Sequence, residues 1–262
     1  LTVYGPNRGL HSGHYGNWAP NPIVRLTHLI DAMRDEEGRI LIPRFENDVR
    51  PLSEAEKRAI AGVPRVDEEL EKEYGFPRPE GGGASLVALL HRPALNVRGI
   101  SAGHVGAEAA NVIVPEASAS IDFRLVPDET PESVRGKVES FVEKQGWFIV
   151  RQAPDAATRA AHPKIVRLEW EGGYPPARTP MDLPFSRAVM AAAERAAGGP
   201  VVKMPTLGGS IPMYLFQGDG KVPVVGVPIA NHDNNQHAAN ENIRLKNLWD
   251  GIELYATLFA EL

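Results

Sequence analysis

The residues best suited to chemistry in this chain are histidines and acids, because it has eight histidines and no cysteine. Any bound metal would therefore be held by His, Asp and Glu side chains. His237 has the most suggestive setting, after an apolar stretch, among small residues and just before Glu241. Sites in α/β folds lie at the carboxyl ends of such strands. One histidine cannot hold zinc, which takes three or four protein ligands, so spacing leaves His237 either a ligand or an ordinary loop histidine.

Three further stretches have the residue types of a binding site. In "GLHSGHYG" (9–16), glycines beside two histidines allow close approach to a ligand, although a simple turn has the same pattern. In "LGGSIP" (207–212), backbone amides and Ser210 could bind a carboxylate or oxyanion, or Ser210 could cap a helix. Arg124 lies on the polar face of a predicted strand, where it is either a carboxylate clamp or a solvated side chain.

The elements that would position these residues form two groups. Helices are predicted from Pro22 and from Pro131, each with apolar residues on one face. Strands are predicted at "LNVRGI" (95–100), "ASASIDFRLV" (117–126), "WFIV" (147–150) and "KIVRLEW" (164–170). This order predicts a ferredoxin-like split βαβ domain over 1–172, with a charged helical insertion at about 35–92. The insertion contains a capping-box signature at Ser53 and Glu56 and a flexible "PEGGG" joint (79–83), and the Pro- and Gly-rich stretch 171–182 is predicted to be a linker.

The remaining residues, 173–262, have the pattern of an α/β segment. We predict a helix over about 184–197, a buried strand at "VPVVGVPI" (222–229), and a final helix with an apolar stripe that includes Trp249 and Ile252. So few elements cannot close a doubly wound core. The predicted fold class is therefore α/β, with an α+β domain followed by the C-terminal portion of an α/β domain.

Composition limits the function classes. The net charge of −5 and the pI near 5.9 argue against nucleic acid as a partner. No apolar run is long enough to span a membrane. The chain opens on "LTVYGPNRGL" with neither a methionine nor a signal-peptide pattern, so we expect it to be part of a longer protein. The cytoplasm is the favoured location, with the periplasm and secretion left open.

Several stretches together resemble the M20 zinc metallopeptidases, and within them the carnosinase-like dipeptidases. "LHSGHYGNWAPNP" resembles the opening of that family's lid domain, and "FENDVRPLSEAEKRAI" is similar to the dipeptidase insertion. "NVIVPEASASIDFRLVPDETPE" resembles the central hairpin of the lid, "GGSIP" the substrate loop, and "HAANENI" the last metal-ligand segment. The resemblance extends over the whole chain, with the motifs in the family's order.

The resemblance implies a lid inserted in an α/β domain that binds two zinc ions per full-length subunit, and a homodimer formed through the lids. It implies that His237 is a zinc ligand and that His11 stabilises the oxyanion in the partner subunit's active site. It further implies that Asn111 assists from the lid and that Arg124 holds the substrate carboxylate. Gly208, Gly209 and Ser210 would contact the substrate. The implied reaction is hydrolysis of an amide in a dipeptide or N-acyl amino acid by a metal-activated water.

Two departures from the family limit this expectation. The family's H-x-D-x-x-P segment, bridging aspartate, Glu-Glu pair and further acidic ligand do not occur at matching places in these 262 residues. We therefore expect the chain alone to be inactive. Leu207 stands where the dipeptidases carry a glutamate for the substrate's amine, which favours a blocked amine. The alternative is a non-catalytic ferredoxin-like module that dimerises or binds a small molecule.

Overall fold

A computed structural model describes residues 1–217 and 222–262. The chain divides into two compact units. Unit 1 comprises Leu1–Arg50, Glu71–Ala84 and His91–Pro176, and unit 2 comprises Pro51–Leu70, Ser85–Leu90 and Ala177–Leu262. The predicted insertion therefore contributes residues to both units.

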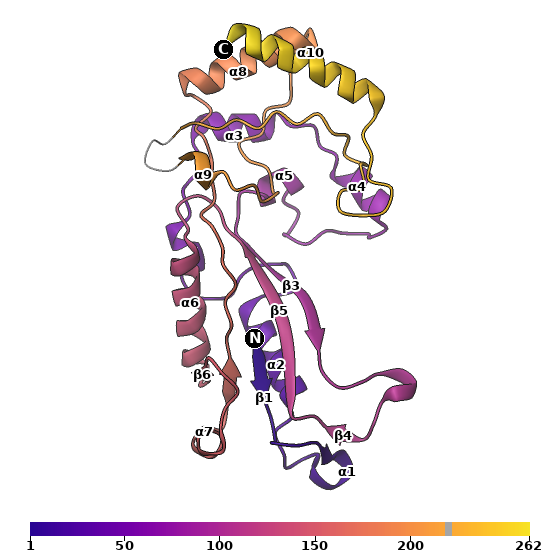
Figure 1. Ribbon diagram of the computed structural model, residues 1–262, viewed down its shortest axis with the longest axis vertical. Coiled ribbons are helices and arrows are strands. Elements are labelled where there is room, and N and C mark those ends of the chain that lie inside the picture. Colours follow the sequence, from indigo (N-terminus) through magenta and orange to yellow (C-terminus); the bar gives the residue numbers. More distant parts are fainter. Residues whose placement is uncertain (218–221) are drawn as a thin grey trace. The chain divides into compact units, whose positions relative to one another are not determined.

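A five-stranded sheet forms the centre of unit 1 (Figure 1). Its strand order is β3-β5-β1-β7-β6, with β6 parallel to β7 and the other neighbours antiparallel. The strands are β1 (Thr2–Tyr4), β3 (Ala94–Ser101), β5 (Glu116–Arg124), β6 (Phe148–Val150) and β7 (Ile165–Arg167). A separate two-stranded ladder joins β2 (Leu10–His11) to β4 (Val112–Ile113). All four strands predicted for this domain are confirmed: β3 extends one residue further at each end, β5 begins and ends earlier, and β6 and β7 are shorter than predicted.

Two long helices pack with this sheet into one core. They are α2 (Pro22–Met33), capped by the Asn21 side chain, and α6 (Pro131–Lys144), capped by Thr130. Their apolar faces meet inward-facing residues of the strands, which explains the predicted helical stripes. Fully buried members of this core include Leu26, Met33, Val142, Val3 and Val166. The short elements of unit 1 are α1 (Ser12–Tyr15), η1 (Phe45–Asp48), η2 (Gly106–Glu108), α7 (Ala156–Ala161) and part of α4 (Asp67–Tyr74).

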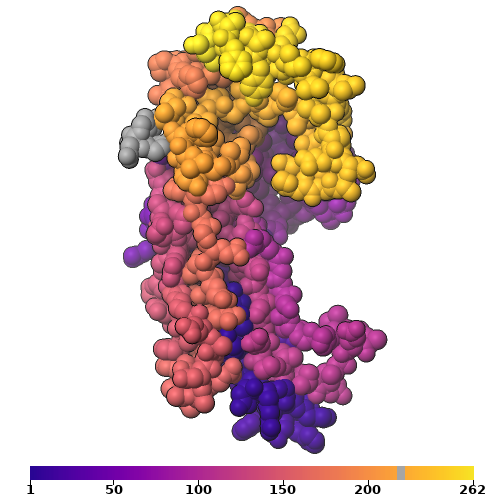
Figure 2. Space-filling view, in the orientation of Figure 1, coloured from indigo at the N-terminus to yellow at the C-terminus, as the bar shows by residue number. Residues whose placement is uncertain are grey.

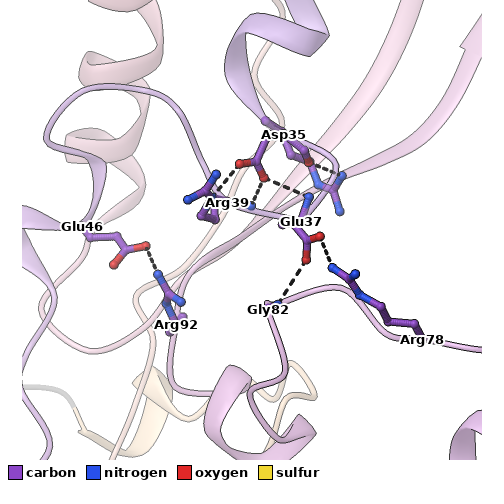
Figure 3. Close-up of polar contacts among 8 residues, drawn as sticks. Asp35, Glu37, Arg39, Glu46, Arg78, Gly82 and Arg92 are labelled. Atoms are coloured by element: carbon purple, nitrogen blue, oxygen red, sulfur yellow. Dashed lines mark hydrogen bonds and ion pairs between the residues drawn. The ribbon is translucent and has the colours of Figure 1, made fainter.

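Ion pairs hold the two ends of the insertion together in unit 1 (Figure 3). Glu37 binds the Arg78 guanidinium with one carboxylate oxygen and accepts the Gly82 N–H with the other, at 3.2 Å. Arg34 forms a second ion pair, with the carboxylate of Glu80. The predicted joint 79–83 does contain left-handed glycines, and it is fixed to the end of α2 by these contacts.

Glu129 is a buried acid in the unit 1 core, only 1% exposed. Its Oε2 accepts the Val126 N–H at 2.9 Å, and its Oε1 has no hydrogen-bond partner among the described residues. Burial raises the pKa of this carboxyl, and Asp48 raises it further while Lys137 lowers it. The folded protein therefore favours the neutral acid.

Replacing Glu129 with glutamine should stabilise the protein at neutral pH. Because the folded-state pKa is raised, the stability that Glu129 contributes is present in acid and is lost as pH rises above the unfolded-state value. We expect Glu129→Gln to match wild type near pH 4 and to exceed it by about 1 kcal/mol at pH 7. Urea unfolding across this pH range measures the difference. A constant difference at all pH values would contradict the assignment.

Unit 2 is mainly helical. Its helices are α3 (Glu54–Ala61), part of α4, α5 (Leu86–Leu89), α8 (Pro184–Ala197), α9 (Tyr214–Gln217) and α10 (Leu245–Glu261). Helix α3 begins with the predicted capping box, in which Ser53 and Glu56 bind each other's backbone N–H groups. A small core joins α8 to α10 through Val189, Ala192 and Leu258, with Val225 and Val227 packed against it.

One prediction for unit 2 is wrong. Residues 222–229 do not form a strand, because no neighbouring strand in the described part of this unit pairs with them. The predicted final helix is present as α10, and in its apolar stripe Trp249 and Ile252 are exposed while Gly251 and Leu258 on the same helix are buried. The helix has apolar residues on more than one side, and the packing against α8 and 225–229 selects only one of them.

Gly251 lies where α10 meets the extended stretch before it. A Cβ built on Gly251 would come within 2.7 Å of Ile229 Cγ2 and 3.0 Å of its Cβ. Gly251→Ala should therefore destabilise unit 2 by about 1–3 kcal/mol, despite the better helix propensity of alanine. Gly136 in α6 is the matched control, because a Cβ there would meet nothing within 4 Å. Gly136→Ala should instead stabilise by about 1 kcal/mol in thermal unfolding, and the same sign for both variants would contradict this packing.

Candidate functional site

Helix α1 and strand β4 lie at one end of unit 1 (Figure 1), and the residues next to them include His11 and Asn111. The β2–β4 ladder pairs His11 with Val112, and the Ser12 N–H donates to the Asn111 carbonyl at 2.9 Å. Both side chains are exposed. Figure 2 shows part of the N-terminal stretch of the chain, in indigo, on the surface at this end of unit 1. We name this region, His11–Tyr15 with Asn111–Ile113, the tip.

The position of His11 is fixed by the helix that follows it. Its Nδ1 accepts the Gly13 N–H at 3.1 Å, so His11 is the N-cap of α1. A neutral imidazole that accepts through Nδ1 carries its proton on Nε2. The exposed Nε2–H can then donate a hydrogen bond to an oxygen atom outside the tip. This geometry fits both readings of the stretch, a simple turn and a loop that presents an imidazole to a ligand.

Arg124 lies at the last position of β5. Its Nε is 2.8 Å from Asp122 Oδ2, two residues earlier on the same strand. The guanidinium is about half exposed, so it is oriented by an acid and open to solvent. This arrangement suits a group that binds a carboxylate reversibly, because Asp122 holds the side chain in place before the ligand arrives.

The tip lies near the first residue of β5, and Arg124 is the last residue of that strand. β5 spans nine residues from Glu116, near the tip, to Arg124. At the usual rise for a strand these two residues are about 26 Å apart. His11 and Arg124 of one chain therefore cannot contact the same dipeptide-sized molecule.

The "GGSIP" loop and the His237 loop both lie in unit 2. Gly208, Gly209 and Ser210 precede α9, which begins at Tyr214, so Ser210 is not the N-cap of that helix. His237 is exposed and has a left-handed backbone conformation, with φ of 64°. Such a conformation is uncommon for histidine and marks a tightly shaped loop.

Asn231 closes the base of the His237 loop. This buried side chain accepts the Arg244 N–H at 3.0 Å and donates to Asp233 at 2.8 Å and to Asn242 at 3.3 Å. The hydrogen bond from Asn231 lowers the pKa of the Asp233 carboxyl, and Arg244 lowers it further. The loop between 231 and 244 is thus held at its base by polar contacts.

The described residues do not by themselves fit a metal ion. No group of three or more His, Cys, Asp or Glu side chains close enough to hold one occurs in the part of the chain that the structure describes. Asp233 lies in the same loop as His237, and its carboxylate is engaged by Asn231 and Arg244. His237 can therefore supply one ligand to a metal centre, and the rest would have to come from elsewhere.

Sequence reasoning missed a buried ion pair in unit 2. Arg178 Nε lies 2.8 Å from Glu56 Oε1, with both side chains almost fully buried. Glu56 was recognised only as part of a capping box, and Arg178 was read as part of a linker. The Pro-rich context around Arg178 gave no signal, because burial of a charge depends on residues more than 100 positions away in the chain.

The fold and these residues define a class before any comparison: a split βαβ domain with a polar tip, joined to a mainly helical unit that carries the Gly-Gly-Ser loop and the His237 loop. The family model described as a peptidase dimerisation domain, M20_dimer, matches residues 1–146. The chain therefore belongs to the M20 peptidase family and carries its dimerisation domain.

Relatives along the whole chain agree with this family. The Cys-Gly metallodipeptidase dug1 of Schizosaccharomyces pombe is 27% identical over 271 residues, covering 100% of this chain and 53% of the relative. The human Beta-Ala-His dipeptidase is 26% identical, covering 98% and 49%. The M20 metallo-carboxypeptidase Sso-CP2 of Sulfolobus solfataricus has a similar structure, with a TM-score of 0.79, 26% identity, and coverage of 100% and 56%. The chain spans about half the length of the curated relatives it matches.

No helix among the described residues combines the length and apolar character needed to cross a membrane.

Proposed function

We propose that this chain provides the lid and the C-terminal catalytic segment of a metal-dependent M20 hydrolase that cleaves an amide bond in a dipeptide or an N-acyl amino acid. Family membership and the metallodipeptidase relatives support the reaction class. The observation that carries the assignment is the tip, where folding brings His11 and Asn111 together from 100 residues apart with an oriented Nε2–H.

Each candidate residue has a role that its surroundings support. Arg124, oriented by Asp122, binds the substrate carboxylate. His11 and Asn111 donate hydrogen bonds to the carbonyl oxygen as negative charge develops on it. Gly208, Gly209 and Ser210 offer backbone and hydroxyl groups near the substrate. His237 provides one ligand to a zinc centre, and we propose that the remaining ligands lie outside these 262 residues.

A second copy of the chain completes the site in this proposal. His11 and Arg124 of one chain are too far apart to act on one substrate, so the tip would serve the site of the partner in a homodimer. The dimerisation-domain match supports this arrangement. In the described sheet, edge strand β3 pairs on one side only, with β5, and exposes Val97 and Ile100. An edge of this kind is suited to pairing with a second copy.

The side chain at position 207 affects which kind of amine group the substrate can carry. The Leu207 side chain is about half exposed beside the Gly-Gly-Ser loop. A leucine cannot pair with an ammonium group, so we propose a substrate whose amine is acylated or lies elsewhere. Exposed apolar residues of α10, Trp249 and Ile252 among them, would be covered by the remainder of the α/β domain.

A panel of free and N-acetylated dipeptides tests the proposed function. The enzyme containing this chain should hydrolyse the acetylated members at least about tenfold faster in kcat/KM, and chelation should abolish the activity. The 262-residue chain alone should hydrolyse none of them. Preference for free amines would overturn the substrate assignment, and turnover by the chain alone would overturn the assignment of missing ligands.

A further inference from the structure

The insertion supplies a support for the substrate loop. Although residues 35–92 interrupt the lid in sequence, Ser85–Leu90 packs within unit 2, the unit that contains Gly208 and Ser210. Several hydrogen bonds hold this short segment. The Ser85 hydroxyl accepts the Ala88 N–H at 3.3 Å, the Leu90 N–H donates to the Leu86 carbonyl, and the Leu86 N–H donates to Asp67 Oδ1 at 2.7 Å.

The contact with Asp67 is a charged one. The Leu86 N–H is the main cause that lowers the pKa of the Asp67 carboxyl, and Arg65 pairs with the same carboxylate at 2.9 Å. Since Asp67 is the first residue of α4, the segment 85–90 is attached to a helix rather than to another loop. Leu90, at the end of α5, is therefore held in place before it meets the substrate loop.

Leu90 lies directly against Gly208. A Cβ built on Gly208 would be 2.7 Å from Leu90 Cδ2, closer than real Cβ contacts allow. The backbone of Gly208 is not in the left-handed region, and a side chain at 208 would have to displace the end of the Leu90 side chain. Gly209 differs, because a Cβ there would meet no atom within 4 Å. One glycine thus faces the insertion, and the next faces open space.

We propose that Leu90 is a positioning residue for substrate binding, setting the place of the Gly208–Ser210 backbone. The volume of the side chain at position 90 limits how closely the Gly208 backbone can approach α5. It therefore sets the positions of the Gly209 N–H and the Ser210 hydroxyl. This inference rests on the proposed function for its effect on substrate, and it makes the insertion a structural part of the substrate site. The contact itself lies within unit 2 and does not depend on that function.

Hydrogen–deuterium exchange and steady-state kinetics test the proposal together. In the 262-residue chain, Leu90→Ala should speed exchange of the 207–211 amides about tenfold, because the backbone loses its support. In the enzyme containing the chain, the same substitution should raise KM for an N-acetyl dipeptide about tenfold and leave kcat within about twofold. Leu90→Met, which nearly preserves volume, should restore both values. Leu86→Ala is the matched control, since Leu86 lies in the same helix and is exposed.

The outcomes separate this proposal from the proposed function. Unchanged exchange at 207–211 in Leu90→Ala overturns the positioning role whatever the activity. Changed exchange with unchanged KM, or an equal effect of Leu86→Ala, overturns it as well. If no variant and no wild-type enzyme hydrolyses any amide, the proposed function fails, and the exchange data alone still decide whether Leu90 supports the loop. If Leu90→Ala does not fold, Leu90→Val gives the same comparison with a smaller loss of side-chain volume.

Discussion

Replacing Arg178 with methionine should lower the free energy of unfolding of unit 2 by about 3–5 kcal/mol, because it leaves the Glu56 carboxylate buried without its counter-charge. The Arg178 and Glu56 side chains are only 2% and 6% exposed, and their closest atoms are 2.8 Å apart. Arg178 also donates to the Pro51 carbonyl, and Glu56 accepts the Ser53 N–H at 2.6 Å. The pair therefore attaches α3 of the insertion to the C-terminal residues of the same unit.

A double variant distinguishes an unpaired charge from lost packing. Glu56→Gln keeps an oxygen for the Ser53 N–H and removes the negative charge, so Arg178→Met with Glu56→Gln should fall within about 1 kcal/mol of wild type. Lys246→Met is the control, because Lys246 pairs with Asp250 at the surface of unit 2 and should cost less than about 0.5 kcal/mol. Hydrogen–deuterium exchange of the α3, α8 and α10 amides at increasing urea concentration reports on the unfolding of this unit. A single variant no weaker than the control would contradict the buried-pair argument.

The lid could be predicted from sequence because its signals are local. The alternation of Ile121, Phe123 and Leu125 marks β5, and Thr130 followed by Pro131 marks the start of α6. Such patterns depend on residues within one or two turns or strand positions. The structure confirms these elements and the capping box at Ser53.

Unit 2 was harder to predict because its signals are not local. Residues 222–229 have the composition of a buried strand, but a strand needs a neighbour, and sequence does not show whether one is present. Thr179 shows how this stretch is held instead, since its hydroxyl bonds both the N–H and the carbonyl of Val224, at 3.0 and 2.7 Å. A threonine 45 residues away gives no periodic signal.

For the candidate site, too, sequence predicted some features and not others. The types of His11, Arg124 and Ser210 identified them as able to do chemistry, but only the resemblance to a family connected them. The structure adds two facts that spacing could not supply: the Gly13 N–H that orients His11, and the β5 length that separates it from Arg124. Those two facts show that the tip and Arg124 of one chain cannot share one small molecule, and together with the proposed roles of these residues they lead to the prediction with the largest effect on activity.

Mixing two inactive variants of the full enzyme should restore activity. His11→Ala and Arg124→Ala should each lower kcat/KM by about 100-fold or more, because one removes a donor to the oxyanion and the other the carboxylate clamp. If the tip serves the partner's site, a mixed dimer has one site with both residues intact and one site with neither. Random reassortment makes about half of the dimers mixed, so the mixture should recover about a quarter of wild-type activity.

A second mixture provides the control. His11 and Asn111 lie on the same tip, so a dimer of His11→Ala with Asn111→Ala contains no site that receives both intact groups. This mixture should stay as inactive as its components, although its subunits exchange equally well. Activities would be measured after the subunits are mixed under exchange conditions, with mass spectrometry to count mixed dimers. Recovery in neither mixture while mixed dimers are abundant would show that the tip acts on its own subunit or not at all. Recovery in both would show that His11 and Asn111 do not serve the same site.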